Sequence, residues 1–165
     1  MIRRTFSNIW FIFTALLTGL SSPLALGSPS VTPLRATIVF TEWVAPSSAG
    51  EPCALIGTIT GDGVTTKLGA VHLASRDCIN PVSPTSFVFL SDDVVLTIGG
   101  DEIWAAYGGT LSVADGTIKG SYFIFGGTGR FAHATGVGTI NGFEAINFEN
   151  GMGEGQIELK GSLAY

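Results

Sequence analysis

Apolar and polar residues alternate along most of the chain in short runs with a period of two residues. The alternation is clear from Thr37 onward, and pairs such as Asp115-Gly116 and Asn150-Gly151 interrupt it. Alternation of this kind predicts β-strands that are buried on one face, and these pairs favour tight hairpins because both residues tolerate a positive φ. No segment has the period of a long amphipathic helix. The pattern therefore predicts an all-β protein of consecutive antiparallel strands.

Nine strands are expected from these runs. They cover residues 36–45, 53–60, 66–74, 85–90, 93–99, 102–112, 117–125, 134–142 and 153–164. Turns are assigned to Gly61-Asp62-Gly63, Asp92-Asp93 and Gly99-Gly100-Asp101. Glycine also recurs within strands, as in Gly138-Thr139-Ile140, and it weakens a strand unless the sheet bends or packs closely there. We therefore expect a curved sheet that closes into a barrel, which also removes exposed strand edges.

Side-chain direction follows from the same alternation, because neighbouring residues of a strand point to opposite faces. With Glu102 and Lys119 facing water, an apolar interior with two phenols is predicted. The inward residues are Ile103, Ala105, Tyr107, Ile118, Tyr122, Ile124, Ile157, Leu159 and Leu163. Of these, Tyr107, Tyr122, Ile103 and Ile124 are the candidates for lining a ligand cavity.

Three aromatic residues, Trp104, Phe123 and Phe125, fall on the outward face in this assignment. An aromatic cluster is costly to leave in water, so one interpretation is that it forms a subunit interface. The other interpretation is that the two faces are inverted and that these residues fill the core.

The start of the chain has the features of an export signal. Arg3 and Arg4 precede an apolar run from Ile9 to Leu20, which small residues follow up to Gly27. A membrane-spanning helix needs about 20 apolar residues, so we predict a signal peptide of residues 1–27, with an uncleaved anchor as the alternative. Residues 28–35 are assigned to a linker and residues 36–165 to a single domain. The protein is accordingly expected to be secreted or periplasmic.

Cys53 and Cys78 are the only cysteines. In an exported protein an even pair is expected to form a disulfide. A metal pair or a reactive thiol would need further ligands or a basic neighbourhood, and neither cysteine has these nearby in the sequence.

Composition and motifs exclude several classes of function. The chain has a net charge of −5 and no basic cluster, so nucleic acid is not an expected partner. His72 and His133 lack a carboxylate pair at ligand spacing, so no metal site is predicted. The glycine runs lack the Lys-Ser/Thr of a phosphate loop, no Gly-x-Ser-x-Gly elbow is present, and no cofactor is expected.

Three glutamates, Glu102, Glu144 and Glu149, could supply the carboxylate pair that glycoside hydrolysis requires. Acidic residues on the outside of strands are usually solvated, however. We therefore expect these three side chains at the surface.

The segment from Gly126 to Gly136 reads Gly-Gly-Thr-Gly-Arg-Phe-Ala-His-Ala-Thr-Gly. It resembles the allene oxide cyclase barrel-like family of secreted bacterial proteins and, more remotely, the plant dirigent proteins; the resemblance to the bacterial group extends over roughly 53–165. It implies an eight-stranded antiparallel barrel, often trimeric in the plant relatives, whose mouth can hold an apolar ligand. Gly126, Gly127 and Gly129 are assigned to a structural turn. The arginines of the dirigent motif are replaced here by Ala132 and Thr135, so the plant chemistry is not expected to carry over.

Three classes of function follow. The favoured one is a non-enzymatic exported barrel that binds a small apolar molecule or acts as a surface or interaction module. The alternative is an isomerase or cyclase that steers a reactive intermediate by shape. The third is a small outer-membrane barrel, because alternating residues run up to the terminal aromatic Tyr165. Against the third class, the expected strands 66–74, 85–90 and 93–99 are shorter than the roughly ten residues that a membrane strand needs.

Overall fold

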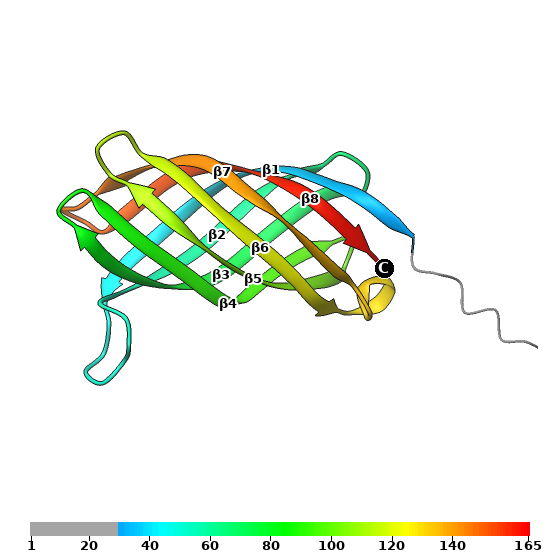
Figure 1. Cartoon of the computed structure of the whole chain (residues 1–165), viewed down its shortest axis with the longest axis horizontal. Helices are drawn as coiled ribbons and strands as arrows, with labels where there is room; N and C mark the ends of the chain where they lie inside the picture. The colour runs from blue at the N-terminus through cyan, green and yellow to red at the C-terminus, as the bar shows by residue number, and fades with distance from the viewer. Residues whose placement is uncertain (1–29) are drawn as a thin grey trace, which may run out of the picture.

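Eight antiparallel strands form a single closed barrel in the computed structural model, which describes residues 30–165 (Figure 1). The strands are β1 (Val31–Pro46), β2 (Leu55–Thr65), β3 (Gly69–Ser83), β4 (Ser86–Ile98), β5 (Asp101–Ser112), β6 (Thr117–Gly127), β7 (Thr135–Asn147) and β8 (Met152–Ala164). Each strand pairs with the next along the chain, and β8 closes the barrel against β1. The predicted fold class is confirmed. The predicted signal peptide, residues 1–27, lies outside the described residues.

The first strand begins earlier than expected. Residues 31–35, which the sequence assigns to the linker, belong to β1, where Val31 pairs with Ala164 and Arg35 with Lys160 of β8. Leu34 is buried, so this segment also contributes to the core. Pairing with the last strand of the chain extends β1 in this direction.

Two of the expected turns are wrong. Gly61-Asp62-Gly63 lies inside β2, which pairs with β1 along its whole length. Glycine fits at position 63 because a Cβ there would overlap the carbonyl oxygen of Thr37 in β1. Asp92 and Asp93 lie inside β4, where the pairing with β5 shifts between Ser91 and Val94. Such a bulge absorbs extra residues without ending the strand, so two expected strands are one.

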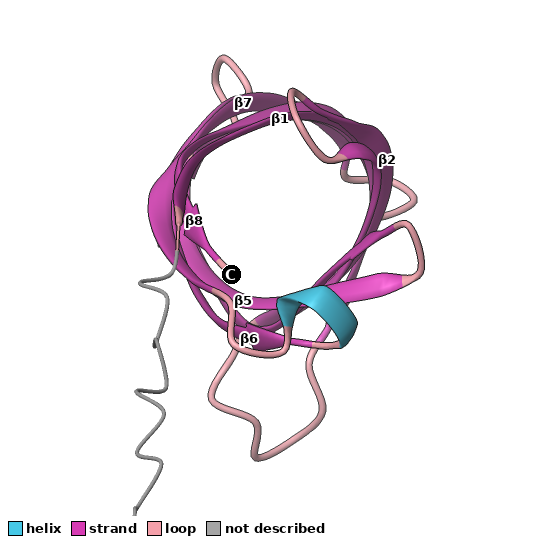
Figure 2. Ribbon diagram, turned by 90° about the vertical axis from the view of Figure 1, so that its right-hand side faces the viewer, coloured by secondary structure: helices cyan, strands magenta, loops and turns pink. Residues whose placement is uncertain are grey.

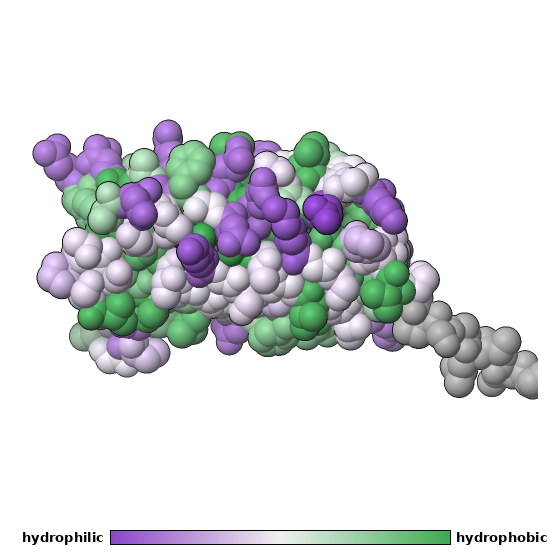
Figure 3. Space-filling model, turned by 45° about the horizontal axis from the view of Figure 1, so that its top comes forward, coloured by the Kyte–Doolittle hydropathy of each residue, from purple (hydrophilic) through white to green (hydrophobic). Residues whose placement is uncertain are grey.

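The two faces of the barrel have opposite character. The residues predicted to point inward are buried or pack against the core, whereas Trp104, Phe123 and Phe125 are exposed. The interpretation with inverted faces is therefore wrong. Figure 3 shows hydrophilic side chains across the middle of one outer face with apolar ones scattered among them. Among the described residues, none of the helices is long and apolar enough to cross a membrane.

The 3-10 helix η1 (Gly129–Phe131) lies at the rim of one end of the barrel, beside β5 and β6 (Figure 2). Phe131 is fully buried and packs against Tyr165, with ring centroids 5.1 Å apart. Of the glycines assigned to a turn, Gly126 and Gly127 end β6, and Gly129 begins η1 with a φ of +51°. The segment from Gly126 to Gly136 thus contributes a buried aromatic side chain to this end of the barrel, and we call it the plug.

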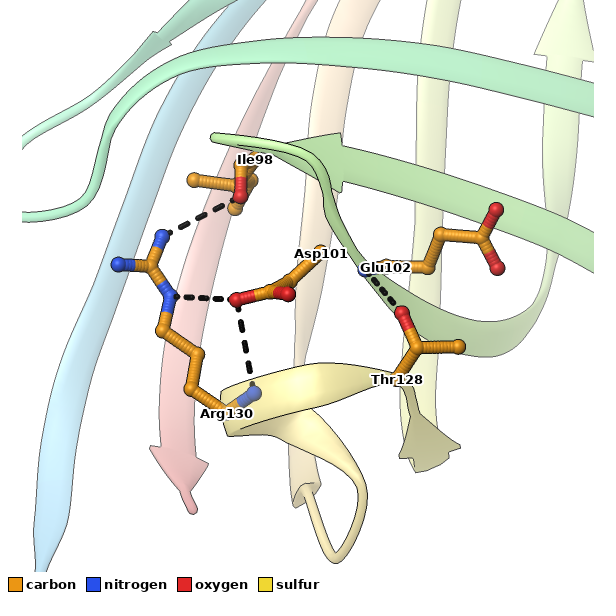
Figure 4. A network of polar contacts seen from close by, with 5 residues as sticks. All are labelled: Ile98, Asp101, Glu102, Thr128 and Arg130. Atoms are coloured by element: carbon orange, nitrogen blue, oxygen red, sulfur yellow. Dashed lines mark hydrogen bonds and ion pairs between the residues drawn. The ribbon is translucent and has the colours of Figure 1, made fainter.

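Polar contacts hold this plug on the turn between β4 and β5 (Figure 4). The backbone N–H of Glu102 donates to Thr128 Oγ1 at 2.9 Å. Arg130 donates through Nη2 to the carbonyl of Ile98 at 3.3 Å, and its Nε lies 3.6 Å from Asp101 Oδ2. The side chain of Arg130 therefore serves to attach the plug to the turn between β4 and β5.

Near the opposite end, Cys53 and Cys78 form a disulfide with a Cα–Cα distance of 5.2 Å. The bond joins the loop between β1 and β2 to the strand β3. The predicted pairing is confirmed.

Candidate functional site

The barrel contains a cavity of about 250 Å³ in the half opposite η1. Most of its lining is apolar, with side chains such as Phe40, Ile59, Leu73, Leu111, Ile140 and Ile157. The lining extends to Pro46 and Leu55 at the ends of strands and to Phe148 in the turn after β7. Because Phe148 is 67% exposed, the cavity reaches the surface at this end.

Three acidic side chains interrupt this apolar lining. Glu42 projects from β1, Asp77 from β3 and Glu144 from β7, and each is at most 5% exposed. The expectations of a wholly apolar interior and of Glu144 at the surface were therefore wrong. The alternation of side chains along β7 explains why Glu144 points inward, since Glu144 shares its face of this strand with the buried Ile140.

Asp77 is the centre of a hydrogen-bond network at one side of the cavity. Tyr107 Oη donates to Asp77 Oδ1 at 2.5 Å, and Ser75 Oγ donates to the same oxygen at 2.8 Å. Burial raises the pKa of Asp77 to about 7, although these two hydrogen bonds act in the opposite direction. Burial and the neighbouring Asp77 also raise the pKa of Tyr107 well above 10. Near neutral pH, Asp77 can therefore exist in either protonation state.

Glu42 and Glu144 form a carboxyl pair within hydrogen-bonding reach of each other. Burial, together with the contact to Glu144, raises the pKa of Glu42 to about 9, and burial raises the pKa of Glu144 as well. Two adjacent buried carboxyl groups cannot both ionise cheaply, so the pair retains a proton near neutral pH. The Oε1 atoms of both residues are buried without a hydrogen-bond partner.

Two glycines leave room for this pair. A Cβ on Gly57 of β2 would overlap Glu42 Oε1, and a Cβ on Gly153 of β8 would overlap Glu144 Oε1. Strand glycines thus serve here to accommodate the carboxyl groups, in addition to allowing curvature.

The four cavity candidates from the sequence are distributed unevenly. Tyr107 lines the cavity, where its ring meets Phe89 edge to face at 5.8 Å. Ile103, Ile124 and Tyr122 are buried but do not belong to the cavity lining. Burial raises the pKa of Tyr122 to about 12, and its hydroxyl has no hydrogen-bond partner.

The other polar candidates lie away from the cavity. Glu102 accepts a hydrogen bond from Trp104 Nε1 at 3.0 Å, and Glu149 is exposed. His72 contacts Asp62 at 2.8 Å on the outer face, and His133 is exposed beside η1. Within residues 30–165, no three or more His, Cys, Asp or Glu side chains are placed so that together they could hold a metal ion.

Sequence reasoning did not identify Glu42 and Asp77, although the signal was present. Glu42 shares its face of β1 with Ile38 and Phe40, and Asp77 shares its face of β3 with Leu73. Applying the alternation rule to these strands, as was done for the segment around Tyr107, would have placed both carboxyl groups inside.

The fold and the site together define an up-and-down β-barrel with an apolar cavity that contains a buried acidic cluster. Comparison with known proteins finds no family model that matches the chain and no matching curated protein. A raised pKa allows a carboxyl group to donate a hydrogen bond, or to exchange a proton, near neutral pH. The arrangement can therefore hold an apolar molecule and direct polar atoms at one part of it.

Proposed function

We propose that this protein is an exported, non-enzymatic barrel that binds a small, largely apolar molecule in its cavity. The observation that carries the proposal is the 250 Å³ cavity, whose lining is apolar apart from a few convergent polar groups. Ligand sites generally have this composition. Since a dry cavity of about 150 Å³ can hold benzene, the space suits a molecule of roughly ten non-hydrogen atoms.

Native mass spectrometry of the mature protein, purified without denaturation or lipid stripping, tests this proposal. A reproducible mass excess that disappears on unfolding is the expected result. Val44→Trp places a large side chain among the lining residues and should remove the excess mass, whereas Val39→Trp on the outer face of β1 should retain it. An unliganded barrel that also fails to take up added apolar compounds would refute the proposal.

Export is supported by the disulfide, because such bonds persist in oxidising compartments. The predicted signal peptide of residues 1–27 agrees with this location. Fractionation should recover a chain lacking these residues outside the cytoplasm, and a full-length cytoplasmic product would contradict it.

The polarity of the two faces weighs against the outer-membrane alternative. Membrane barrels present an apolar band to lipid and keep polar residues inside. In this barrel the interior is mainly apolar, whereas Arg35, Asp62, Lys119 and Glu154 lie on exposed positions of four strands. The sequence-based argument that the strands are too short for a membrane barrel was wrong, since β3 and β4 have 15 and 13 residues. If salt or carbonate washing removes the protein from the membrane fraction, this result would support a barrel that is not embedded in the outer membrane.

An isomerase or cyclase activity is the second candidate, and the contact between Asp77 and Tyr107 inside the cavity favours it. Both groups can exchange protons with a bound molecule, which an isomerase or cyclase requires of its acid or base. A compound recovered from the native protein should then be converted by wild type and not by Asp77→Asn. Equal conversion by both proteins would reject Asp77 as the acid or base.

We further propose that copies of the chain associate through the exposed aromatic cluster of Trp104, Phe123 and Phe125. Phe123 and Phe125 are about half exposed, and Val137 on the neighbouring β7 adds another exposed apolar side chain. The native mass should correspond to an oligomer, a trimer by the family resemblance, and Phe123→Ser with Phe125→Ser should lower it to that of one chain. A monomeric wild type would contradict this.

A further inference from the structure

The titratable side chains that line the cavity are all acidic. Its polar lining residues are Glu42, Asp77, Tyr107 and Glu144, and none of the lysines, arginines and histidines within residues 30–165 lines it. An apolar ligand alone would not require these groups, and burying a carboxyl group without a partner is unfavourable. Their presence inside a cavity that reaches the surface calls for a complementary group on the ligand.

We propose that the bound molecule is an apolar amine, whose cationic nitrogen lies among the carboxyl groups of Glu42, Asp77 and Glu144. This inference rests on the proposed ligand-binding function and names the chemical class of the ligand.

The hydrogen-bonding capacity of the site supports an ammonium group. Glu42 Oε1 and Glu144 Oε1 are buried acceptors without a donor. An ammonium group has three hydrogens to donate, whereas an alcohol has one and an ionised carboxylic acid has none. The two glutamates come from β1 and β7, the strands on either side of β8, and Glu144 Oε1 occupies the space in which a side chain on Gly153 of β8 would lie.

Interactions among the acidic side chains of the cavity also favour a cationic ligand. Asp77 of β3 raises the pKa of Glu144, and Glu42 raises that of Asp77, so the three acidic groups act on one another. Tyr107 of β5, the remaining titratable lining residue, is uncharged near neutral pH. A cation among these groups favours their ionised forms, whereas a carboxylate would add a further like charge. Binding of the protonated amine should therefore release protons from the cavity into solution.

Three probes of equal chain length separate the head group from the apolar tail: octylamine, 1-octanol and octanoate. Calorimetric titration of the unliganded protein at pH 7 should show octylamine binding about 10- to 100-fold more tightly than 1-octanol, as charge-assisted hydrogen bonds predict. Octanoate should bind most weakly. Repeating the octylamine titration in buffers of different ionisation enthalpy should reveal proton release, which 1-octanol should not cause.

Substitution of the carboxyl pair provides the matched comparison. Glu42→Gln with Glu144→Gln preserves the side-chain shape and should remove most of the preference for octylamine over 1-octanol, whereas Glu154→Gln on the outer face of β8 should leave it unchanged. If the double variant does not fold, proton release in the wild type decides the question. Binding of 1-octanol or octanoate at least as tight as that of octylamine would overturn the amine assignment and leave the proposed function standing. Failure of all three probes to bind would overturn both.

Discussion

Replacing Asp77 with asparagine should make the protein more stable at pH 8 while leaving its stability near pH 4 almost unchanged. Burial raises the pKa of Asp77 from its ordinary value of 3.8 to about 7. The folded state therefore binds this proton more tightly than the unfolded state between these two pH values. Folding stability must then fall as the pH rises through this window. Asparagine keeps the shape and the acceptor oxygen for Tyr107 and Ser75, but it has no proton to lose.

The expected size follows from the difference between the two pKa values. Three pH units at 1.36 kcal/mol each correspond to about 4 kcal/mol, most of which is lost between pH 4 and pH 8. For a domain of this length, that loss lowers the melting temperature by roughly 10 to 15 °C. Glu42 and Glu144 add a loss of the same sign in both proteins, because burial raises their pKa values too. Asp77→Asn removes the loss due to Asp77 and also lowers the loss due to Glu144, because Asp77 raises the pKa of Glu144, and the two effects have the same sign.

Urea denaturation followed by circular dichroism at pH 4, 6 and 8 measures this difference. The curves of stability against pH should diverge as the pH rises, with the variant above the wild type. Asp92→Asn, which removes an exposed carboxylate from the bulge in β4, should follow the wild type. Parallel curves for wild type and Asp77→Asn would show that Asp77 does not titrate in this window, and they would refute the reasoning.

Two further predictions concern the two ends of the barrel. Cys53→Ser should lower stability by about 3 to 4 kcal/mol, the chain-entropy value for a loop of this length, and reductant should lower the melting temperature of the wild type but not of the variant. Labelling of two free thiols in the native protein would contradict this. Gly129→Ala should destabilise the plug by about 1 to 3 kcal/mol, because φ is +51° and the added Cβ would overlap Asp101 Oδ1. Gly126→Ala, whose Cβ would lie 3.4 Å from the Trp104 ring, is the milder control, and equal melting temperatures for the two variants would be inconsistent with a strained plug.

Much of the barrel could be predicted because strand alternation is a local property. The inward positions of Ile103, Tyr107 and Ile124 follow from the period of two in their own strands. The merged strand β4 could not be predicted in the same way. Asp92 and Asp93 carry the local signal of a turn, and only pairing with β3 and β5 keeps them within a strand.

The sequence by itself determined the class of fold, the pairing of Cys53 with Cys78 and the face on which most side chains lie, because each depends on neighbours in the chain or on cysteine number. The tertiary structure decided that Glu42, Asp77 and Glu144, from three different strands, surround one apolar cavity. Barrel closure brings these carboxyl groups together and removes them from water, and the resulting desolvation raises their pKa values. No local pattern contains that information, since burial arises only when all eight strands enclose the same space.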